Sequence, residues 1–520
     1  MEELMEELQE DTITVTSIDQ SFLFIDAELA IIRELNEFFS FMTPNCYFMP
    51  QYKSGIWDGK TRLFKARSSS LPAGLFGILT KFAQDSEYTL IDRRTLSKHE
   101  KPTTEQVDTF LKDLKPHSDG KLIEHYDYQA EAVKISLQQE RATILSSTSS
   151  GKSLIIYSLI RWYQQMVNRK ILILVPSVNL VDQMYSDFDD YASQSQWNSE
   201  DNCHKIRQGI KKNADKKIYI STWQSVYKMP KDYFEQFDAI LCDEVHLASA
   251  ASIMGIMEKA NNAFVRIGFT GTLKEMKLHK LSIIGLFGDI TRVSSNRELM
   301  DRGVVTPLDV KFMMLKYNEK ICKEVNRKVV EKVTPGGKKI YRNNYANEMD
   351  FISETLARNI YISNLASVLP GNVLILFNKV QKHGKPLFKL LKKRLDKKKN
   401  VYYISGETKV DNREKIRGTL SKETNAVLVA SYGTLSTGVN IKSLQYVIFA
   451  SPYKSEIKVL QSIGRILRKF KGKKKAVLFD IVDDFRYKKS VNYSYKHFTK
   501  RFEIYKSEKF PVTVSEYKLL

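Results

Sequence analysis

Cysteine is scarce in this sequence, and long apolar runs are absent from it. The four cysteines are far apart and form no CxxC pair: Cys46, Cys203, Cys242 and Cys322. This spacing argues against a disulfide framework or a zinc site and predicts reduced, buried thiols. No apolar run approaches the roughly 18 residues of a spanning helix. The acidic start MEELMEELQE lacks the order of a signal peptide. We therefore expect a cytoplasmic protein without a membrane partner.

Acidic residues are also few relative to basic ones. The 520 residues include 81 Lys and Arg against 60 Asp and Glu, a net charge of +21. Such an excess predicts an acidic partner, with nucleic acid the first candidate and an anionic membrane surface the second. The alternative is that the charge serves only solubility or a basic tail. The length is that of about three domains, taking roughly 150 residues for each.

The first 118 residues differ from the rest in their sequence pattern and predict a small α+β domain. Residues 27–40 carry apolar side chains near helical spacing and predict a helix. Asp58-Gly59 precedes an alternating run and predicts a tight hairpin, because a two-residue turn needs positive φ. The polar segment 97–121 is typical of a linker.

Short apolar runs alternate with helical patterns after residue 122. The runs are ATIL, ILILV, KIYIST, AILCDE and RIGFT, followed by NVLILF, NVYYIS, NAVLVA, YVIFA and KAVLFDIV. Runs without a polar face, placed between helices, predict parallel sheets covered on both sides. We expect two tandem α/β domains, at residues 119–305 and 306–490.

Two basic segments interrupt or follow this pattern. Residues 320–342 hold eight Lys or Arg against two Glu, with a Pro335-Gly336-Gly337 turn, and predict a basic insertion at about 317–345. Residues 491–520 are expected to form a basic C-terminal tail.

The stretch LSSTSSGKSL at residues 145–154 joins a predicted strand to a predicted helix. This context is the one that a phosphate-binding loop requires, because loop and helix N–H groups can surround phosphate oxygens. Lys152 would contact the β- and γ-phosphates of ATP, and Ser153 would ligate Mg²⁺. Ser146 stands where such loops usually have glycine. The alternative for an isolated match is a simple helix N-cap.

Asp243-Glu244-Val245-His246 follows the apolar run AILC, so both carboxylates are expected at the carboxyl end of a strand. Ligands bind at that edge in open α/β sheets. Asp243 could hold Mg²⁺ and Glu244 could orient the attacking water, since phosphoryl transfer depends mainly on positioning and charge. The alternative is a solvated acidic loop.

The segment QSIGRILR at residues 461–468 places two arginines three residues apart, and they are expected to share a helix face. Guanidinium groups suit the charge that develops on a transferring phosphoryl group. If the second α/β domain closes over the nucleotide, Arg465 and Arg468 would reach it. The alternative is a basic helix face.

Nine blocks occur in one order along residues 122–482, and together they are highly specific. They are YQ (128–129), STSSGKS (147–153), VPSVNLVDQ (175–183), STWQS (221–225), DEVH (243–246), TGT (270–272), LILFNKV (374–380), SYGTLSTGVNI (431–441) and QSIGRILR (461–468). This set resembles that of superfamily 2 helicases, and most closely the UvsW helicase family of T-even-type bacteriophages. That family also shows a motif like YKSGIWDGKTRLF (52–64).

The resemblance implies a fold of class α/β, with two RecA-like parallel-sheet domains preceded by the small α+β domain. It implies further roles for individual residues. Gln129 would read adenine, with Tyr128 or Tyr126 stacking on it, and Thr270 and Thr272 would couple the nucleotide to domain closure. Gln461 would lie close to the attacking water, and Gly438 would lie near the γ-phosphate and the nucleic-acid path. The remaining predicted nucleotide contacts are Ser147, Thr148, Ser149, Ser150 and Gly151. Ser177, Thr222 and Trp223 would touch the tracked strand, although core packing is an equal alternative for Trp223.

The resemblance also implies the substrate: branched DNA such as Holliday junctions and stalled forks, and RNA–DNA hybrids in R-loops. Duplex and single strands, and single-strand-binding or recombination proteins, would be further partners of a monomeric enzyme. Candidate phosphate contacts are Lys53, Lys60, Arg62, Lys338 and Lys339, while Trp57 could either pack in the core or stack on a base. The basic segments 469–475 and 487–506 are further candidates.

Three other functions fit parts of the sequence. An RNA helicase of superfamily 2 is one, although DEVH in place of DEAD and the added N-terminal domain argue against it. A binding or annealing protein with a regulatory ATP site is another, although Glu244 and both arginines are present. A restriction-system motor is the third, although no nuclease-type cluster of carboxylates and lysine stands out in residues 1–118.

Overall fold

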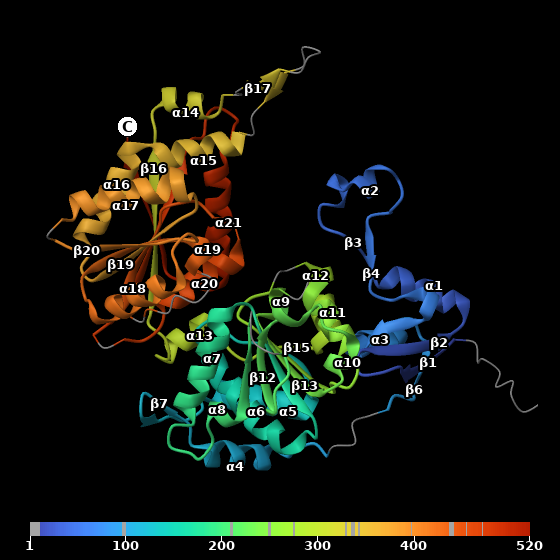
Figure 1. Ribbon diagram of the computed structural model, residues 1–520. Helices are drawn as coiled ribbons and strands as arrows, with labels where there is room; N and C mark the ends of the chain where they lie inside the picture. Colours follow the sequence, from blue (N-terminus) through green and yellow to red (C-terminus); the bar gives the residue numbers. More distant parts are fainter. Residues whose placement is uncertain are drawn as a thin grey trace, which may run out of the picture. The chain divides into compact units, whose positions relative to one another are not determined.

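The computed structural model describes residues 11–95, 100–207, 212–247, 251–273, 276–327, 330–333, 339–341, 344–396, 398–435, 441, 443–453, 455–470 and 472–519. The chain forms two compact units (Figure 1). The first comprises residues 1–146 and 151–294, and the second comprises residues 147–150 and 295–520. Among the described residues, no helix has the length and apolar character needed to span a membrane.

The N-terminal domain of the first unit is a four-stranded sheet of order β5-β2-β1-β6 with helices packed on it. Its elements are β1 Thr12–Ser17, β2 Phe22–Ala27, α1 Leu29–Phe38, β3 Ser40–Met42, α2 Pro50–Lys53, β4 Lys60–Arg62, β5 Ser70–Pro72, α3 Phe76–Asp85 and β6 Thr89–Asp92. Helix α1 confirms the helix expected at residues 27–40, because Ile31, Ile32 and Leu35 face the core at helical spacing.

Two expectations for this region are wrong. Asp58-Gly59 does not connect two adjacent strands: β4 pairs with β3, and the intervening residues 43–59 form a lobe that includes α2. Gly59 does adopt positive φ, at 77°, but it packs beneath the ring of Tyr52. Residues 97–121 are not merely a linker, because α4 (Thr104–Leu114) buries Val107 and Leu111 in the core of the following domain.

The rest of the first unit is a seven-stranded, all-parallel sheet of order β11-β12-β10-β13-β14-β9-β15. The strands are β9 Arg141–Leu145, β10 Lys170–Val175, β11 Cys203–Ile206, β12 Ile218–Thr222, β13 Phe237–Asp243, β14 Val265–Thr270 and β15 Ile290–Arg292. The five strands expected from apolar runs are confirmed. The edge strands β11 and β15 lacked such runs and were not predicted.

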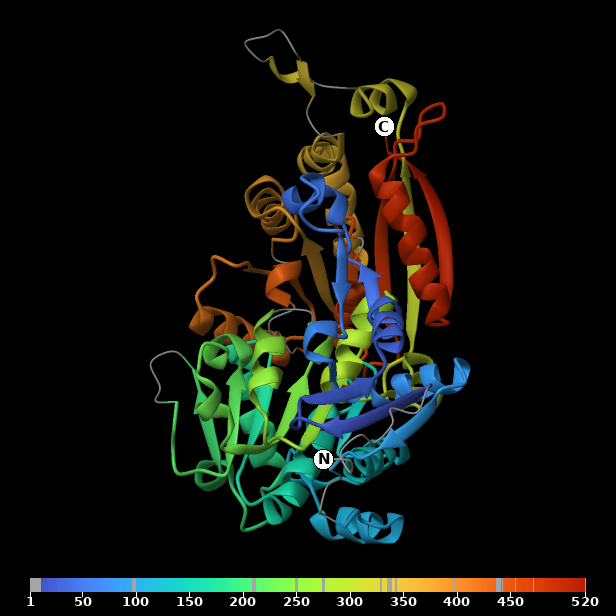
Figure 2. The same ribbon diagram turned by 90° about the vertical axis from the view of Figure 1, so that its right-hand side faces the viewer.

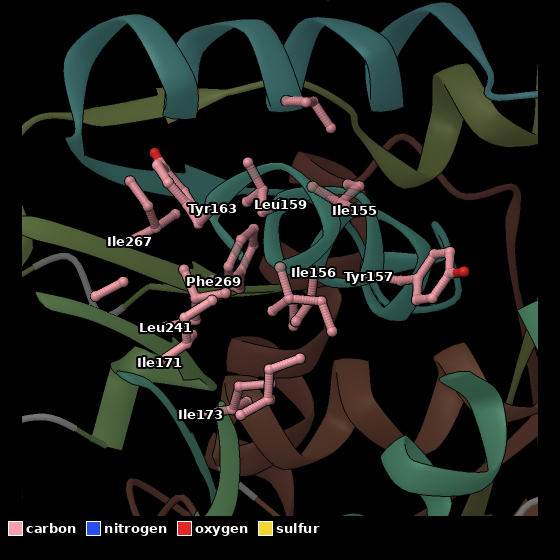
Figure 3. Packing of buried hydrophobic residues seen from close by; sticks show 14 of the residues in the cluster. Ile155, Ile156, Tyr157, Leu159, Tyr163, Ile171, Ile173, Leu241, Ile267 and Phe269 are labelled. Atoms are coloured by element: carbon pink, nitrogen blue, oxygen red, sulfur yellow. The ribbon is translucent and has the colours of Figure 1, made fainter. Parts of the chain in front are cut away.

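Helices cover both faces of this sheet, as continuous apolar strands require. On one face lie α4, α5 (Asp127–Gln139), α6 (Lys152–Met166) and α7 (Val178–Tyr191). On the other lie α9 (Trp223–Val226), α10 (Lys231–Phe234), α11 (Ala251–Lys259) and α12 (Lys277–Phe287). Figure 3 shows α6 presenting Ile156, Leu159 and Tyr163 toward strand residues such as Ile171 and Phe269. The phosphate-loop helix is therefore anchored along its length.

The two parts of the first unit are joined by a buried arginine. Arg266 on β14 is 1% exposed and donates to the carbonyls of Met257 (3.0 Å), Ala260 (2.8 Å) and Ala263 (2.9 Å), at and beyond the C-terminus of α11. It also donates to the hydroxyl of Ser21 in the N-terminal domain, at 2.7 Å. Leu281 of α12 packs in the core of the N-terminal domain. The domain is therefore fixed to the first α/β sheet.

The second unit contains another seven-stranded parallel sheet, of order β20-β21-β19-β22-β23-β16-β24. The strands are β16 Leu308–Lys316, β19 Asn372–Phe377, β20 Asn400–Ile404, β21 Ala426–Ser431, β22 Leu444–Phe449, β23 Ala476–Asp484 and β24 Val512–Lys518. The helices are α13 Asn296–Asp301, α14 Glu319–Val325, α15 Asn344–Glu354, α16 Leu356–Val368, α17 Lys385–Arg394, α18 Val410–Lys422, α19 Tyr432–Leu435, α20 Glu456–Ile466 and α21 Tyr493–Ser507. The five predicted strands are confirmed.

The end of the chain is not a tail, so that expectation is wrong. Helix α21 packs on the second sheet, and β24 joins it beside β16 (Figure 2). Arg501 of α21 is fully buried and pairs with Asp480 of β23 at 2.7 Å. In the predicted insertion, β17 (Val330–Val333) pairs with β18 (Lys339–Tyr341) in antiparallel fashion. The expected turn at residues 335–337 lies outside the described residues.

Candidate ATP-binding site

The phosphate loop lies where β9 ends and α6 begins, as predicted. Gly151 caps α6 with φ of 79°, a left-handed conformation that favours glycine. A Cβ atom at Gly151 would also lie 2.5 Å from Nε2 of Gln129, so any other residue would have to displace that amide group. Lys152 opens the helix, and its ammonium group donates to the carbonyl of Ser146 at 3.2 Å. The loop thus has the conformation and the cation of a phosphate site.

Ser146, in the place usually held by glycine, is fully buried. Its hydroxyl lies 3.1 Å from the hydroxyl of Ser294, and its N–H donates to the carbonyl of Thr270 at 3.0 Å. The polar side chain therefore has a hydrogen-bonding partner in the interior. This contact explains how a serine is accommodated at the start of the loop.

The residues predicted to recognise adenine lie at the N-terminus of α5. Gln129 is 3% exposed, and its side-chain oxygen accepts from the N–H of Tyr126 at 3.0 Å. The rings of Tyr126 and Tyr128 stack with centroids 5.6 Å apart and 9° between planes. Tyr128 is buried whereas Tyr126 is 43% exposed, so Tyr126 offers the open aromatic face.

Asp243 ends β13 and is the candidate cation ligand of the site. Burial and the neighbouring Glu244 charge raise the pKa of Asp243 to about 7, while the Lys152 ammonium opposes that rise. Among the described residues, its buried Oδ1 atom has no hydrogen-bond partner. A buried carboxylate oxygen of this kind suits a hard divalent cation such as Mg²⁺. The residues present therefore fit the predicted metal.

Glu244 and His246 connect the carboxylate motif to β14. Glu244 has φ of 56°, an uncommon conformation that tends to occur at functional sites. His246 is buried, and its Nδ1 atom lies 3.0 Å from both Glu244 Oε2 and Thr270 Oγ1. The Thr270 hydroxyl donates to the carbonyl of Thr272 at 2.8 Å, so Nδ1 of His246 carries the hydrogen. The carbonyl of Thr270 in turn accepts a hydrogen bond from the N–H of Ser146.

These contacts form one continuous path from the phosphate loop to the predicted catalytic carboxylate: Ser146, Thr270, His246 and Glu244. The role of His246 could not be assigned from DEVH alone, because it depends on the parallel pairing of β13 with β14. The path links the loop to the carboxylate through hydrogen bonds.

Ser153, the second predicted Mg²⁺ ligand, makes a contact that the sequence did not suggest. Its hydroxyl lies 2.8 Å from the hydroxyl of Tyr191, the last residue of α7. The Tyr191 ring also contacts Tyr157 of α6. Nothing in the local sequence marked Tyr191, since the contact comes from the packing of α7 on α6.

Comparison with known proteins agrees with this geometry. The chain is 34% identical to the ATP-dependent DNA helicase uvsW of Enterobacteria phage T4 over 509 residues, which cover 95% of this chain and 97% of the relative. The chain belongs to the UvsW helicase family. It is therefore an ATP-dependent DNA helicase of superfamily 2 with two RecA-like domains, as predicted.

Other matches agree with membership of the UvsW family. Family models match "DNA helicase UvsW, N-terminal" at residues 12–92, "Type III restriction enzyme, res subunit" at 122–275 and "Helicase conserved C-terminal domain" at 356–470. The crystal structure of T4 UvsW is 33% identical, with a TM-score of 0.51 over 98% of this chain and 100% of that one. A DNA 3'-5' translocase XPB2 of Sulfurisphaera tokodaii is 24% identical over 69% of this chain and 82% of its own.

The arginine motif of this helicase lies at the end of α20. Arg465 lies in the last turn, but α20 ends at Ile466, so the expectation that Arg468 shares its helix face is wrong. The carbonyl of Leu467 accepts the N–H of Thr306 at 2.7 Å, and that of Arg468 accepts the ammonium of Lys473 at 3.1 Å. These contacts occupy the carbonyls that would accept hydrogen bonds in a further turn of the helix. Gln461 lies within α20.

The residues predicted to touch nucleic acid in the first α/β domain differ in exposure. Trp223 is 4% exposed within the apolar core, so core packing is correct and base contact is wrong. Thr222 is buried, and its hydroxyl lies 2.9 Å from that of Ser225. Ser177 precedes α7 with a buried hydroxyl that, among the described residues, has no partner.

The basic residues predicted in the N-terminal domain are partly neutralised. Lys60 pairs with Glu37, and Arg62 pairs with Asp58. Lys53 is exposed on α2. Lys339 begins β18, while Gly438 and Lys338 lie outside the described residues.

Proposed function

We propose that this DNA helicase remodels branched nucleic acids, with Holliday junctions, regressing forks and R-loops as its substrates, in the cytoplasm of a phage-infected cell. The observation that carries the motor part is the path from Ser146 through Thr270 and His246 to Glu244. It couples the phosphate loop to the residue that would orient the attacking water. A regulatory nucleotide site would not need that connection.

Each site residue has one role in the proposed reaction. Lys152 would bind the β- and γ-phosphates, and Asp243 and Ser153 would hold the Mg²⁺ that neutralises phosphate charge when bound. Glu244 would orient the water, held by the N–H of His246. Arg465 and Arg468 of the second unit would act on the transferring phosphate, and Gln461 would lie near the water. ATP hydrolysis would then alternate closure and opening of the two RecA-like domains along DNA.

Ser153 would have to leave the Tyr191 hydroxyl in order to ligate Mg²⁺. Tyr191→Phe removes that competing contact, so the Mg²⁺ concentration for half-maximal binding of a fluorescent ATP analogue should fall about threefold. Tyr185→Phe, on the same helix with its ring against Lys205, is the matched control and should leave binding unchanged. An equal response of both variants would contradict the role of Tyr191.

The lobe of residues 43–59 supports the part of the proposal that concerns branched nucleic acids as substrates. Several of its apolar side chains are exposed: Tyr47 60%, Phe48 76%, Met49 38% and Ile56 82%. A solvent-facing apolar cluster usually marks an interaction site. Apolar side chains can insert between base pairs where a duplex is already open. In contrast, Phe64 is buried and offers no stacking surface, while Trp57 is half-buried and its ring N–H donates to the carbonyl of Lys60.

The deciding experiment measures ATPase rate without nucleic acid and with single-stranded DNA, duplex, four-way junction, R-loop and structured RNA. Strong stimulation by junctions and R-loops, lost in Lys152→Ala, supports the proposal. Lys112→Ala, an exposed lysine on α4, is the control. Stimulation by RNA alone would contradict the substrate, and binding without stimulated turnover would leave a binding protein.

A further inference from the structure

A dense basic surface lies at the β20 edge of the second sheet, in the segment between the motifs LILFNKV and SYGTLSTGVNI. It consists of the exposed residues Lys389, Lys392, Lys393 and Arg394 of α17, Lys398 before β20 and Lys422 at the end of α18. We call this set the β20-edge basic surface. Strand β20 is the edge strand of its sheet (Figure 1).

Three lysines of α17 face away from the core: Lys389, Lys392 and Lys393. Leu387, Leu391 and Leu395 are fully buried along one side of the helix. Lys389, Lys392 and Lys393 share the opposite side at i, i+3 and i+4 spacing, where like charges repel. Among the described residues, none of the three makes an ion pair with a carboxylate. Other lysines of the unit do, as in Lys316–Asp484 and Lys475–Asp309.

The same edge contains an open pocket of about 450 Å³, lined by Lys398, Lys399 and Lys422 together with polar residues. Its one carboxylate, Glu423, is occupied by neutral donors: Asn400 at 2.9 Å and the Tyr402 hydroxyl at 2.6 Å. The pocket therefore retains an excess of positive charge. It is large enough for a phosphate group.

This surface is separated from the loops that face the tracked strand. Residues 398–399 and 422–425 precede β20 and β21, so they lie at the amino ends of these strands. The motifs LILFNKV and SYGTLSTGVNI continue past the carboxyl ends of β19 and β21. The six residues of β21 span about 20 Å at roughly 3.3 Å each. One strand of nucleic acid along the motif loops would leave the basic surface free.

The side chains present favour a duplex over a single strand. Single-strand sites combine basic grooves with exposed aromatic rings on which bases stack. In the described part of residues 372–425, no large apolar or aromatic side chain is exposed. Phe388 and Tyr403 pack against each other instead. A surface of unpaired cations without stacking platforms contacts phosphates and carries no base preference.

We propose that the β20-edge basic surface binds the phosphate backbone of a duplex arm of the branched substrate, apart from the strand along which the helicase moves. The inference rests on the proposed branched-DNA function and adds a second nucleic-acid site to it. It would hold one arm while the motor moves another.

The test is a triple variant, Lys389→Gln, Lys392→Gln and Lys393→Gln, in the full-length protein. The matched control, Lys112→Gln, Lys115→Gln and Lys121→Gln, removes the same charge from exposed positions in the first unit. Dissociation constants are measured without ATP for a four-way junction and a single strand, between 50 and 200 mM salt. A second variant, Lys398→Gln with Lys422→Gln, tests the pocket.

We expect junction affinity to fall about tenfold or more in the triple variant, and the slope of log K against log salt to shrink by about 2.7, at 0.9 per lost phosphate contact. Single-strand affinity and the control should not change. Equal losses for junction and single strand, or a loss matched by the control, would overturn the proposal. Failure of the branched-DNA function itself would appear separately, as a wild-type enzyme that binds junctions without stimulated ATPase.

Discussion

The two units bury arginine in different ways. Among the described residues, the guanidinium of Arg266 in the first unit bonds to carbonyls and the Ser21 hydroxyl and to no carboxylate, and burial lowers its pKa well below the usual value. In the second unit, burial also acts against the charge of Arg501, but Asp480 more than offsets it and raises the pKa. Arg358 pairs with Asp483 in the same manner, at 2.7 Å.

The two units therefore stabilise a buried guanidinium charge in two different ways. Arg266 uses the carbonyls beyond the C-terminus of α11, where the helix dipole favours a cation. Arg358 and Arg501 instead hold α16 and α21 against two faces of one strand, since Asp480 and Asp483 are three residues apart on β23. The first arrangement joins two domains, and the second attaches helices to a sheet.

The largest expected effect comes from breaking a charge pair. Arg501→Met would leave Asp480 buried and unpaired, at a cost of about 3–5 kcal/mol in the free energy of unfolding. The double variant with Asp480→Asn should recover most of that loss, because Asn keeps the contact with the Tyr505 hydroxyl. Urea unfolding with hydrogen exchange of β23 measures both. A double variant as unstable as the single one would contradict the pairing.

Arg266→Met should cost less, about 2–3 kcal/mol, since the unpaired carbonyls are partly compensated by removing a buried charge. Hydrogen exchange should increase in β1, β2 and α11 together, because the arginine joins both domains. Arg292→Met, an exposed arginine on β15, is the control and should change stability by less than about 0.5 kcal/mol. Faster exchange in α11 alone would show that the joint does not depend on Arg266.

His383 is a buried base that stays neutral, unlike the buried arginines that are paired with aspartates. It is buried between Ser451 and Asn359, and burial, Arg358 and Lys379 lower its pKa to about 3. Its contribution to stability is complete above the unfolded pKa of about 6.5 and declines as pH falls toward 3. Between pH 6.5 and 5, we expect about 2 kcal/mol of unfolding free energy to be lost. His383→Gln should show a shallower pH dependence, and an unchanged slope would contradict the assignment.

The smallest effect concerns Ser21 of the N-terminal domain, which accepts a hydrogen bond from Arg266. Ser21→Ala removes the hydrogen bonds to Arg266 and to the Met257 carbonyl, at 2.7 and 2.9 Å. We expect about 1 kcal/mol, visible as faster exchange at the start of β2. Ser54→Ala, in the exposed lobe, is the control. A loss as large as that of Arg266→Met would mean that the carbonyl contacts contribute little.

Central strands could be predicted because burial on both faces demands continuous apolar residues, as in β10 and β19. The edge strands β11, β15 and β24 could not, whereas the edge strand β20 was predicted from NVYYIS. Strand β24 reads VTVSEYK and is mostly exposed, so its sequence resembles a tail until β16 provides the pairing. Helix α4 buries Val107 and Leu111 and packs Phe110 and Leu114 against the same core, but its other residues are polar and resemble a linker.

The residues of the site differ in the same respect: some could be predicted from the local sequence and others could not. Lys152, Asp243 and Glu244 belong to local motifs tied to a strand end, and the structure places them as expected. The contacts of Ser146 with Ser294 and of Ser153 with Tyr191 join residues far apart in sequence, so no local pattern could reveal them. The excursion at residues 43–59 was missed because Asp-Gly specifies a turn without fixing which strands it follows.

The hydrogen bond between Ser146 and Ser294 has a consequence for the path of the polypeptide between the two units. Ser294 is the last residue of the first unit, and Ser146 is the residue before the phosphate loop leaves it. The two points at which the polypeptide exits this unit therefore touch each other. The start of the phosphate loop is therefore hydrogen-bonded directly to the residue at which the chain leaves the first unit.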